Sequence, residues 1–420
     1  MKIQTVKGSY NYLPKEQKIR NYINKILVDT FEKYGYKSIE TPILSYYDIL
    51  SDKYDENNDI LKEIYRLSDQ GNRNLGLRYD LTIPFCTFIA LNKNSISFPF
   101  KRYEIAKVFR DGPIKKGRDR ELTQCDVDVV GIEGEYIEAE LMTLYIDAFE
   151  KMNIDVVIKY NNRKLMTGLI LESGVNEELV PEVTTILDKK EKVTIEELNK
   201  MLKEIGLNND EISNINKFFN MNINELTKIK TNNSVLLEGL EEIDSFNNYL
   251  VKLGIDNKCE FSIGLARGQN YYTGMVFEVF DKSNTVTSSI GAGGRYDNII
   301  GNFINDGNNY PAVGISFGLS SIFEILKDRD MFNETDIDIL IIPLNTEIES
   351  LKLANSLRNK GFKVDIEMNN RKLKKSMEYA NKEGIPYVIV LGEDEIKSGN
   401  IMVKDMLTGK KISIDNIKKI

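Results

Sequence analysis

Apolar residues recur at intervals of three and four positions in the stretch from Pro14 to Tyr34. This spacing places them on one face of an α-helix. A proline at the start and Gly35 after the end are typical of helix boundaries. The pattern therefore predicts an amphipathic helix over this stretch. Its apolar positions are Ile19, Tyr22, Ile23, Ile26, Leu27, Phe31 and Tyr34.

Shorter apolar or alternating runs follow, and these predict β-strands. The first run, Ile39–Leu44, contains Pro42, which cannot donate a ladder hydrogen bond and so belongs at an edge or at a break in pairing. Turn-forming residues, such as those at 281–284, join several of the later runs, which indicates an antiparallel sheet with helices packed on it. Those later strands are expected at Tyr103–Phe109, Gln124–Val130, Phe261–Leu265, Val276–Phe280 and Val313–Phe317.

The pattern changes between about Tyr160 and Gly254, where the chain becomes rich in Lys, Glu and Asn. Apolar residues here recur every three or four positions, as at Ile195, Leu198 and Leu202. The stretch is therefore either a helical insertion or a continuation of the main domain. Strand-like segments on both sides favour an insertion.

Strands and helices alternate from Asp336 onward, which is typical of a small parallel α/β domain. The expected order is strand Ile337–Pro343, helix Glu347–Lys360, strand Phe362–Ile366, helix Leu373–Lys382 and strand Tyr387–Leu391. The predicted fold class is α+β, because an antiparallel sheet core precedes this α/β domain. The predicted segments are 1–159, 160–254, 255–330 and 331–420.

Length and composition agree with a multidomain protein of the cytoplasm. A chain of 420 residues exceeds the usual size of one hydrophobic core, so two or three domains are expected. No apolar run approaches the length of a membrane span and the N-terminus opens no apolar signal region, so an unexported protein is expected. Cys86, Cys125 and Cys259 are far apart, which indicates neither a disulfide framework nor a zinc site.

The distribution of charge and the absence of histidine narrow the possible functions. The net charge is −8, but the part from Asp336 to the end has 15 Lys/Arg against 13 Asp/Glu, which leaves −10 for the rest. Residues 101–120 form a second basic stretch, with eight basic and three acidic residues. Both are ordinary solvated faces unless a motif supports a polyanion site. A chain without histidine excludes Ser-His-Asp hydrolases, His-ligated zinc enzymes and Cys-His nucleophiles.

Four polar clusters stand at or beside strands that should be half buried. They are Arg78–Thr82, Phe109–Arg120, Gln124–Asp128, and Arg267 with Tyr271 and Tyr272. Buried carboxylates and arginines are costly unless they meet one another or a ligand. Separate salt bridges could satisfy each cluster, but one polar pocket explains all four more economically. Arginines at strand ends beside a basic loop suit a phosphate-rich ligand, because the guanidinium group pairs bidentately with phosphate.

These segments resemble the motifs of class II aminoacyl-tRNA synthetases. Pro42 in its strand is similar to motif 1, Phe109–Asp128 to motif 2 and Pro311–Leu319 to motif 3. More narrowly, Ala266–Tyr272 and Gly293–Asp297 resemble the two segments that distinguish histidyl-tRNA synthetases within this class. The resemblance covers the whole chain. It implies a class II antiparallel core, a helical insertion after motif 2 and a C-terminal α/β anticodon-binding domain.

The resemblance implies a cytoplasmic enzyme that ligates L-histidine to tRNA(His) through a histidyl-adenylate, and a homodimer formed through motif 1. The implied histidine-binding residues are Asp80, Thr82, Gln124, Asp128, Tyr271 and Tyr272. The first three would receive the α-ammonium group, because a carboxylate and two neutral acceptors satisfy its three donors. Asp128 and Tyr272 would bind the two imidazole nitrogens, with Tyr271 packed beside the ring. Such hydrogen bonding rejects apolar analogues.

The resemblance also assigns the ATP-binding residues, which are Arg110, Arg118 and Arg267. Arg110 and Arg267 are the implied catalytic residues. They would approach the α-phosphate from two sides and stabilise charge as the carboxylate of histidine displaces pyrophosphate. Mg²⁺ would bridge the phosphates, and no protein metal ligands are expected. A carboxylate is already a nucleophile, so a protein without histidine can run this step.

Two groups of basic residues are expected to contact tRNA. One is Lys115 and Lys116 in the motif 2 loop, and the other is Arg371 and Lys374 near the start of the second C-terminal helix. A solvated basic face is the alternative for the second group. The resemblance of the whole domain favours tRNA.

Two positions depart from the family pattern, and both bear on ATP binding. Ser320 and Ser321 follow Gly318-Leu319, where the family has glutamate and the arginine that holds the γ-phosphate. Asn270 stands where the family usually has aspartate before the two tyrosines. The main alternative is a synthetase-like regulatory subunit of ATP phosphoribosyltransferase, which senses histidine. Such paralogues typically lack the anticodon-binding domain, so the C-terminal α/β segment favours the ligase. A non-catalytic RNA-binding module is a third, more distant possibility.

Overall fold

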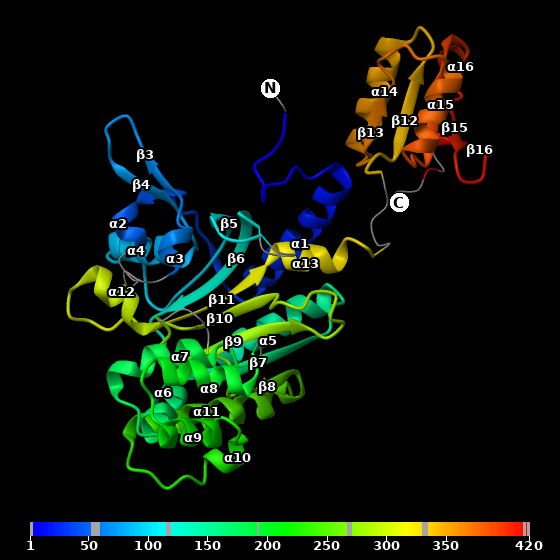
Figure 1. The fold of residues 1–420 in the computed structure, drawn as a ribbon. Coiled ribbons are helices and arrows are strands. Elements are labelled where there is room, and N and C mark those ends of the chain that lie inside the picture. The colour runs from blue at the N-terminus through cyan, green and yellow to red at the C-terminus, as the bar shows by residue number, and fades with distance from the viewer. Residues whose placement is uncertain are drawn as a thin grey trace. The chain divides into compact units, whose positions relative to one another are not determined.

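The fold in Figure 1 is a computed structural model of the chain. It describes residues 3–51, 59–114, 119–190, 193–266, 271–329, 335–414 and 417. The chain divides into two compact units, Met1–Asp328 and Arg329–Ile420. Within the described residues, no helix is both long and apolar enough to cross a membrane.

An eight-stranded sheet forms the centre of the first unit, in the order β1-β5-β6-β11-β10-β9-β7-β8 (Figure 1). Only β1 with β5 and β7 with β8 pair in parallel, so the predicted antiparallel sheet is confirmed. The strands are β1 (Lys37–Ser38), β5 (Phe100–Phe109), β6 (Glu121–Val130), β7 (Val156–Asn162), β8 (Cys259–Phe261), β9 (Met275–Asp281), β10 (Gly291–Arg295) and β11 (Ala312–Gly318).

Three helices cover one face of this sheet: α1 (Pro14–Lys33), α5 (Tyr136–Lys151) and α13 (Leu319–Leu326). The predicted first helix is confirmed, and its apolar face is buried, as at Ile23 and Leu27. The ring of Phe317 from β11 lies 5.6 Å from that of Phe31 on α1 and 4.7 Å from that of Tyr145 on α5. Because side chains alternate along a strand, every second residue of β11 and β6 faces these helices, and the residues between them face the opposite side.

The strand predicted over Ile39–Leu44 is wrong, because the chain leaves the sheet after Ser38. The backbone N–H of Thr41 donates to the side chain of Glu104, and Pro42 has no N–H to donate. Pairing resumes only in a separate small sheet of β2 (Leu44–Tyr46), β4 (Asn74–Leu77) and β3 (Arg66–Ser68). The helices beside it are α2 (Tyr47–Ser51), α3 (Asp59–Glu63) and α4 (Thr82–Asn92), and α4 packs against α12 (Asp297–Ile304).

A group of helices leaves the large sheet after β7 and returns to it at β8 (Figure 1). These helices are α6 (Arg163–Glu172), α7 (Val180–Leu187), α8 (Ile195–Glu204), α9 (Asn209–Phe218), α10 (Ile223–Leu226) and α11 (Ser234–Leu253). The helices predicted for this stretch are confirmed. Because β7 and β8 pair side by side, the group is inserted between neighbouring strands. A Cβ atom added to Gly239 of α11 would lie 2.2 Å from the backbone nitrogen of Leu165, so α6 and α11 pack with their backbones close together.

The second unit has its own five-stranded sheet, in the order β13-β12-β14-β15-β16. Its elements are β12 (Ile339–Pro343), α14 (Glu347–Asn359), β13 (Val364–Ile366), α15 (Leu373–Lys382), β14 (Tyr387–Leu391), α16 (Glu393–Ser398), β15 (Met402–Asp405) and β16 (Lys411–Ser413). The expected alternation holds through β14, where the strands are parallel. The expectation of a purely parallel sheet is wrong beyond it, because β15 and β16 are antiparallel. A tight turn stabilised by the Asp405 carboxylate joins these two strands and needs no crossover helix.

Candidate active site

A cavity of about 240 Å³ lies on the face of the large sheet opposite α1. Its floor comes from β6, β10 and β11, and the remaining walls come from α4, α13, the residue after β5, the residues on either side of β10 and the segment before β9. The structure brings five of the predicted site residues together here. They are Thr82, Arg110, Gln124, Asp128 and Tyr272.

Glycines in the floor make room for two of these side chains. A Cβ atom on Gly314 would lie 1.9 Å from the carboxylate oxygen Oδ1 of Asp128. A Cβ atom on Gly294 would lie 2.7 Å from the ring of Tyr272. No neighbouring atom could yield that much, so the glycine-rich strand β10 and its partner β11 are required for Asp128 and Tyr272 to approach the sheet.

Asp128 is held in a buried network of charges. The guanidinium group of Arg102, which has no exposed surface, places Nη2 2.7 Å from Oδ2 of Asp128, and the hydroxyl of Tyr296 donates to Oδ1. Arg102 also lies near Glu104, which forms an ion pair of 3.2 Å with Arg78. Burial raises the pKa of Asp128, while Arg102 and the Tyr296 hydroxyl oppose the rise. The carboxylate is therefore fixed in position by neighbours on both oxygens.

Neither Arg102 nor Tyr296 was predicted from the sequence as a site residue. The strand register explains their importance, because Arg102 of β5 lies directly opposite Asp128 of β6. The opposite charges of Arg102 and Asp128, both on strands expected to be half buried, could have predicted this contact, because buried charges need partners. Tyr296 belongs to the segment Gly293–Asp297, which resembles the family, but the resemblance assigned no role to it.

Asp126 is a further carboxylate in the cavity that had no assigned role. It is 5% exposed and lies directly opposite Ser316 of β11, which lowers its pKa. Burial is the largest cause that raises the pKa of Asp126, to about 7. The amide nitrogen Nε2 of Gln124 donates to the same serine hydroxyl at 3.4 Å.

Asp80 and Thr82 lie at the start of α4, but only one of them lines the cavity. Thr82 lines the cavity, whereas Asp80 is not among the described residues that line it. The Asp80 carboxylate accepts a hydrogen bond of 3.1 Å from the backbone nitrogen of Ile83, which satisfies a free N–H of the first helical turn. Asp80 is buried, and its charge raises the pKa of both Asp126 and Asp128.

Arg110 follows β5 and supplies positive charge to the cavity. Its Nε donates to the backbone oxygen of Tyr79 at 3.1 Å, and its guanidinium carbon lies 4.4 Å from the centre of the Tyr79 ring. Arg110 lines the cavity. Among the described lining residues, Arg110 is the one arginine or lysine. Arg118 and Arg267, with Lys115 and Lys116, lie outside the described residues.

The first turn of α13 brings serine to the cavity instead of a cation. Ser321 lines the cavity together with Gly318. Ser320 lies instead at a neighbouring pocket with Asp119, whose pKa is raised by burial and lowered by Ser320. Lys327, later in α13, forms an ion pair with Glu324. Motif 3 therefore contributes no positive side chain to the described cavity wall.

The segment Ala266–Tyr272 is held at its start by the end of β7. The side-chain amide of Asn161 donates to the backbone oxygens of Ile263 and Leu265, at 3.1 and 3.0 Å. The guanidinium of Arg163 donates to the backbone oxygen of Ala266 at 3.3 Å, directly before Arg267. Arg163 is also the first residue of α6, so the inserted helices and this segment meet at one point.

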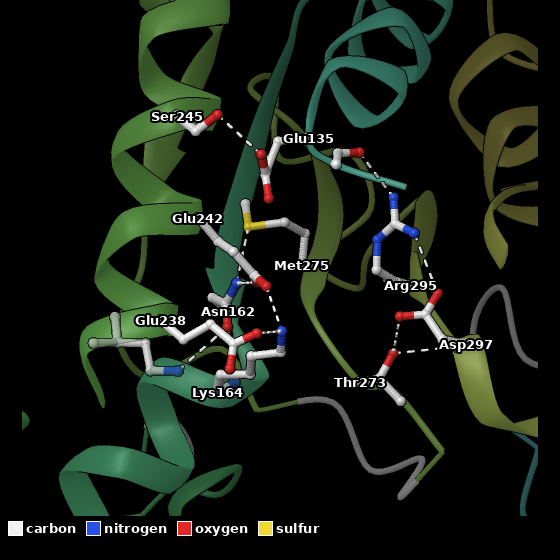
Figure 2. Close-up of polar contacts among 12 residues, drawn as sticks. Glu135, Asn162, Lys164, Glu238, Glu242, Ser245, Thr273, Met275, Arg295 and Asp297 are labelled. Carbon is white, nitrogen blue, oxygen red and sulfur yellow. Dashed lines mark hydrogen bonds and ion pairs between the residues drawn. The ribbon is translucent and has the colours of Figure 1, made fainter. Parts of the chain in front are cut away.

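The same segment is held at its end by α12 and β10, as Figure 2 shows. The Thr273 hydroxyl donates to Asp297 at 3.0 Å, and Arg295 lies 3.2 Å from the same carboxylate. Arg295 also forms an ion pair of 2.6 Å with the buried Glu138, whose pKa burial raises to about 7. Tyr271 packs its ring 4.7 Å from that of Tyr272.

The two basic residues predicted in the second unit lie at the start of α15. Arg371 forms an ion pair of 2.9 Å with Glu367, and its guanidinium lies 4.6 Å from the ring centre of Tyr379. Lys374, in the first turn, is exposed. No cluster of three acidic or cysteine side chains that could hold a metal ion occurs among the residues that the structure describes.

Comparison with known families gives two matches that together span most of the chain. The family model described as histidyl-tRNA synthetase matches residues 8–322. The model described as anticodon binding domain matches residues 338–420.

Individual relatives agree with these matches. Histidine–tRNA ligase 1 of Bacillus cereus is 47% identical over 419 residues, which cover 99% of this chain and 95% of the relative. Histidine–tRNA ligase of Bacteroides fragilis is 35% identical and covers 96% of this chain and 95% of its own. The solved structure of histidyl-tRNA synthetase from Nostoc is 28% identical, has a TM-score of 0.84 and covers 99% of this chain and 97% of its own.

A second solved structure is similar in fold. It is described as an ATP phosphoribosyltransferase regulatory subunit/histidyl-tRNA synthetase from Bacillus halodurans. It is 20% identical, with a TM-score of 0.76, and covers 90% of this chain and 97% of its own. At this identity the likeness supports the fold alone.

Proposed function

The chain belongs to the histidyl-tRNA synthetase family, and from this membership we propose that it ligates L-histidine to tRNA(His) through a histidyl-adenylate. One observation carries the proposal. A single cavity unites an arginine suited to phosphate, Arg110, with side chains that can bind an amino acid, namely Thr82, Gln124, Asp128 and Tyr272.

Asp128 and Tyr272 bind the imidazole of histidine. Asp128 is a fixed acceptor, because Arg102 and Tyr296 hold its carboxylate. The Asp128 carboxylate accepts a hydrogen bond from one ring nitrogen of the imidazole, and the hydroxyl of Tyr272 hydrogen-bonds to the other. An apolar analogue would make neither of these two hydrogen bonds, which gives the site its specificity. Tyr271 supports the ring of Tyr272 by direct packing.

Thr82 and Gln124 bind the α-ammonium group. The amide oxygen Oε1 of Gln124 is buried and, among the described residues, has no hydrogen-bond partner, so it can accept from an incoming ammonium. Asp80 contributes its negative charge from behind the first turn of α4. Its carboxylate already accepts one backbone hydrogen bond, and a carboxylate can accept several.

Arg110, Arg118 and Arg267 bind ATP, and Arg110 and Arg267 are the catalytic pair. A carboxylate oxygen of histidine attacks the α-phosphorus, the bond to the bridging oxygen breaks and pyrophosphate leaves. The arginines stabilise the negative charge that develops on the α-phosphate. No general base is needed, because the attacking carboxylate carries no proton at neutral pH.

Mg²⁺ accompanies the nucleotide and is not held in a protein cage. Of the two carboxylates in the cavity, Asp128 is already engaged by Arg102 and Tyr296, and Asp126 lies beside Ser316. These residues therefore fit an ion whose ligands are mainly phosphate oxygens and water, which is the usual arrangement for Mg²⁺. The ion supplies charge neutralisation between phosphates when it is bound.

The tRNA is held at two places, the motif 2 loop with Lys115 and Lys116 and the C-terminal unit with Arg371 and Lys374. In this division, 1–159 and 255–330 form the catalytic core, 160–254 the insertion and 331–420 the anticodon-binding domain. The protein acts as a cytoplasmic homodimer, paired through the region of Pro42 as in its family. Membership in the family and the match to an anticodon-binding domain support tRNA as substrate.

Histidine-dependent exchange of pyrophosphate into ATP tests the proposal. The purified chain should catalyse exchange with L-histidine and Mg²⁺, and should charge tRNA(His). Arg110→Ala should reduce the exchange kcat by about 100-fold or more, because one transition-state donor is lost. A chain that binds histidine but shows no exchange at saturating substrates would overturn the ligase assignment and support the regulatory subunit, which the relatives at 47% identity do not favour.

A further inference from the structure

We propose that Asp126 is a positioning residue that, through the hydroxyl of Ser316, fixes the side-chain amide of Gln124 in the orientation that binds histidine. The inference deepens the proposed function and rests on its assignment of Gln124 to the α-ammonium group.

The three side chains lie in a row on the cavity face of two paired strands. Asp126 and Gln124 are two residues apart on β6, so they point to the same side of the sheet. Ser316 of β11 lies directly opposite Asp126 in the strand register. Its hydroxyl accepts from Nε2 of Gln124 at 3.4 Å, and it lowers the pKa of the facing Asp126 carboxylate, as a hydroxyl directed at the carboxylate does. All three residues line the cavity.

The chemistry of the row determines which end of the Gln124 amide faces the cavity. An ionised carboxylate only accepts hydrogen bonds, so Asp126 takes the single proton of the Ser316 hydroxyl. The serine oxygen then has only lone pairs left, and it can bind only the NH₂ end of Gln124. The amide oxygen Oε1 is thereby left at the other end of the amide, where it is buried and has no hydrogen-bond partner among the described residues.

The opposite orientation would repel the substrate. If Asp126 could donate a proton to Ser316, the serine hydroxyl would be free to donate to the Gln124 oxygen. The NH₂ group would then face the cavity and meet the α-ammonium group of histidine, donor against donor. A neutral Asp126 therefore removes the constraint that makes Gln124 an acceptor.

The charges around Asp126 set the pH at which this happens. Burial raises the pKa of Asp126 to about 7, the Arg102 guanidinium opposes the rise, and two nearby carboxylates add to it. The charged groups that act on it are Arg102 and Glu104 from β5, Asp128 from β6, and Arg78 and Asp80 from the segment before α4. Asp126 is ionised above its pKa, so the acceptor orientation of Gln124 is held at higher pH and lost as the pH falls.

The first test measures histidine binding by calorimetry, together with the KM values for histidine and ATP in the exchange assay. Asp126→Asn and Ser316→Ala should each weaken histidine binding about tenfold, because a hydrogen bond to a charged group is lost. The KM for ATP should stay within about twofold of the wild-type value, since neither change touches a phosphate ligand. Ser316→Thr keeps the hydroxyl and should restore binding towards wild type.

A second variant gives a result that a purely structural role would not produce. In the Asp126→Asn background, the further change Gln124→Glu should recover histidine binding. The asparagine amide can donate to Ser316, whose hydroxyl then donates to the new carboxylate. The other carboxylate oxygen faces the cavity as an acceptor. Alone, in the presence of Asp126, Gln124→Glu should weaken binding, because two carboxylates compete for one serine proton.

The pH dependence provides the final readout. The ratio of the histidine dissociation constants of Asp126→Asn and wild type should fall towards one as the pH decreases from 8 to 6. Taking the ratio at each pH cancels the titration of histidine itself. Unchanged histidine binding in both Asp126→Asn and Ser316→Ala would overturn the proposal, as would absence of histidine binding by the wild type. If the wild type binds histidine but catalyses no exchange, only the ligase assignment is wrong. The role of Asp126 can then still be tested, because calorimetry measures histidine binding directly.

Discussion

At the scale of single residues, the cavity holds more negative than positive charge. Two carboxylates, Asp126 and Asp128, line it, against the one described cation Arg110. A triphosphate needs more positive charge than one arginine supplies, so we expect the other proposed ATP-binding arginines, Arg118 and Arg267, to supply the rest. Ser321 stands where the family pattern has an arginine, which makes the γ-phosphate the least supported part of the nucleotide.

Ser321→Arg should therefore strengthen ATP binding. Ser321 lines the cavity from the first turn of α13, so a longer side chain can extend along the wall towards the outer phosphates. We expect the KM for ATP in the exchange assay to fall about fivefold, which corresponds to roughly 1 kcal/mol for one partly solvated charge-assisted contact. Ser321→Gln, which is long but neutral, serves as the control. An unchanged KM for ATP in a stable Ser321→Arg protein would mean that the γ-phosphate lies elsewhere.

Tyr296→Phe should weaken histidine binding and make it more sensitive to acid. The hydroxyl of Tyr296 lowers the pKa of Asp128, so its removal raises that pKa, and Asp128 becomes protonated at a higher pH. We expect histidine to bind about tenfold more weakly, because a buried carboxylate loses a donor. The difference from wild type should widen as the pH falls from 8 to 6. Tyr310→Phe removes an exposed hydroxyl bonded to Asp306 and should leave binding unchanged.

At the scale of elements, the junction of β7 and α6 links the inserted helices to the cavity. Asn161 and Arg163 hold the backbone on the N-terminal side of Arg267. Asn162, between them, caps α6 and donates to Glu242 of α11, as Figure 2 shows. Lys164 forms ion pairs with the same helix α11. A displacement of the helices would therefore reach the segment that carries Arg267.

Arg163→Met should test this link, since it keeps an apolar stem and removes the guanidinium. We expect the exchange kcat to fall about tenfold or more, because a small displacement of a catalytic group is costly. Arg163→Lys can still donate to the Ala266 oxygen and should recover part of the rate. Lys164→Met is the matched control, because it loses only partly exposed ion pairs with α11. Equal kcat values for both methionine variants would show that Arg163 does not position the segment.

The elements also show what local pattern can and cannot predict. The helix α15 and the strand β14 were predicted with their observed bounds, because periodicity and turn residues agree there. The strand β10 gave no signal, since glycine has little preference for strands and its role is to leave room for Asp128 and Tyr272. The motif residues at the cavity could be predicted from resemblance. The partners that hold them, such as Arg102, depend on strand register, which a single sequence does not specify.

At the scale of the whole molecule, each compact unit is built around an apolar core of its own. In the second unit, Ile339, Ile341 and Ile389 on neighbouring parallel strands pack with residues of that unit. In the first unit, a core beside the cavity includes Phe85 and Tyr296. The described part of the cavity is formed entirely by residues of the first unit. Adenylate formation and recognition of the anticodon are therefore assigned to separate units.

This separation predicts the effect of removing the second unit. A chain ending at Asp328 should keep histidine-dependent exchange within about threefold of the full chain, because its core and cavity are intact. Its kcat/KM for charging tRNA(His) should fall by about 100-fold or more, because binding at two linked places is reduced to one. In the full chain, Lys374→Glu should weaken charging but not exchange, and more strongly at low salt, as for a phosphate contact. If the truncated chain stayed folded but lost exchange, the adenylation site would need the second unit, and the assignment of one reaction step to each unit would be wrong.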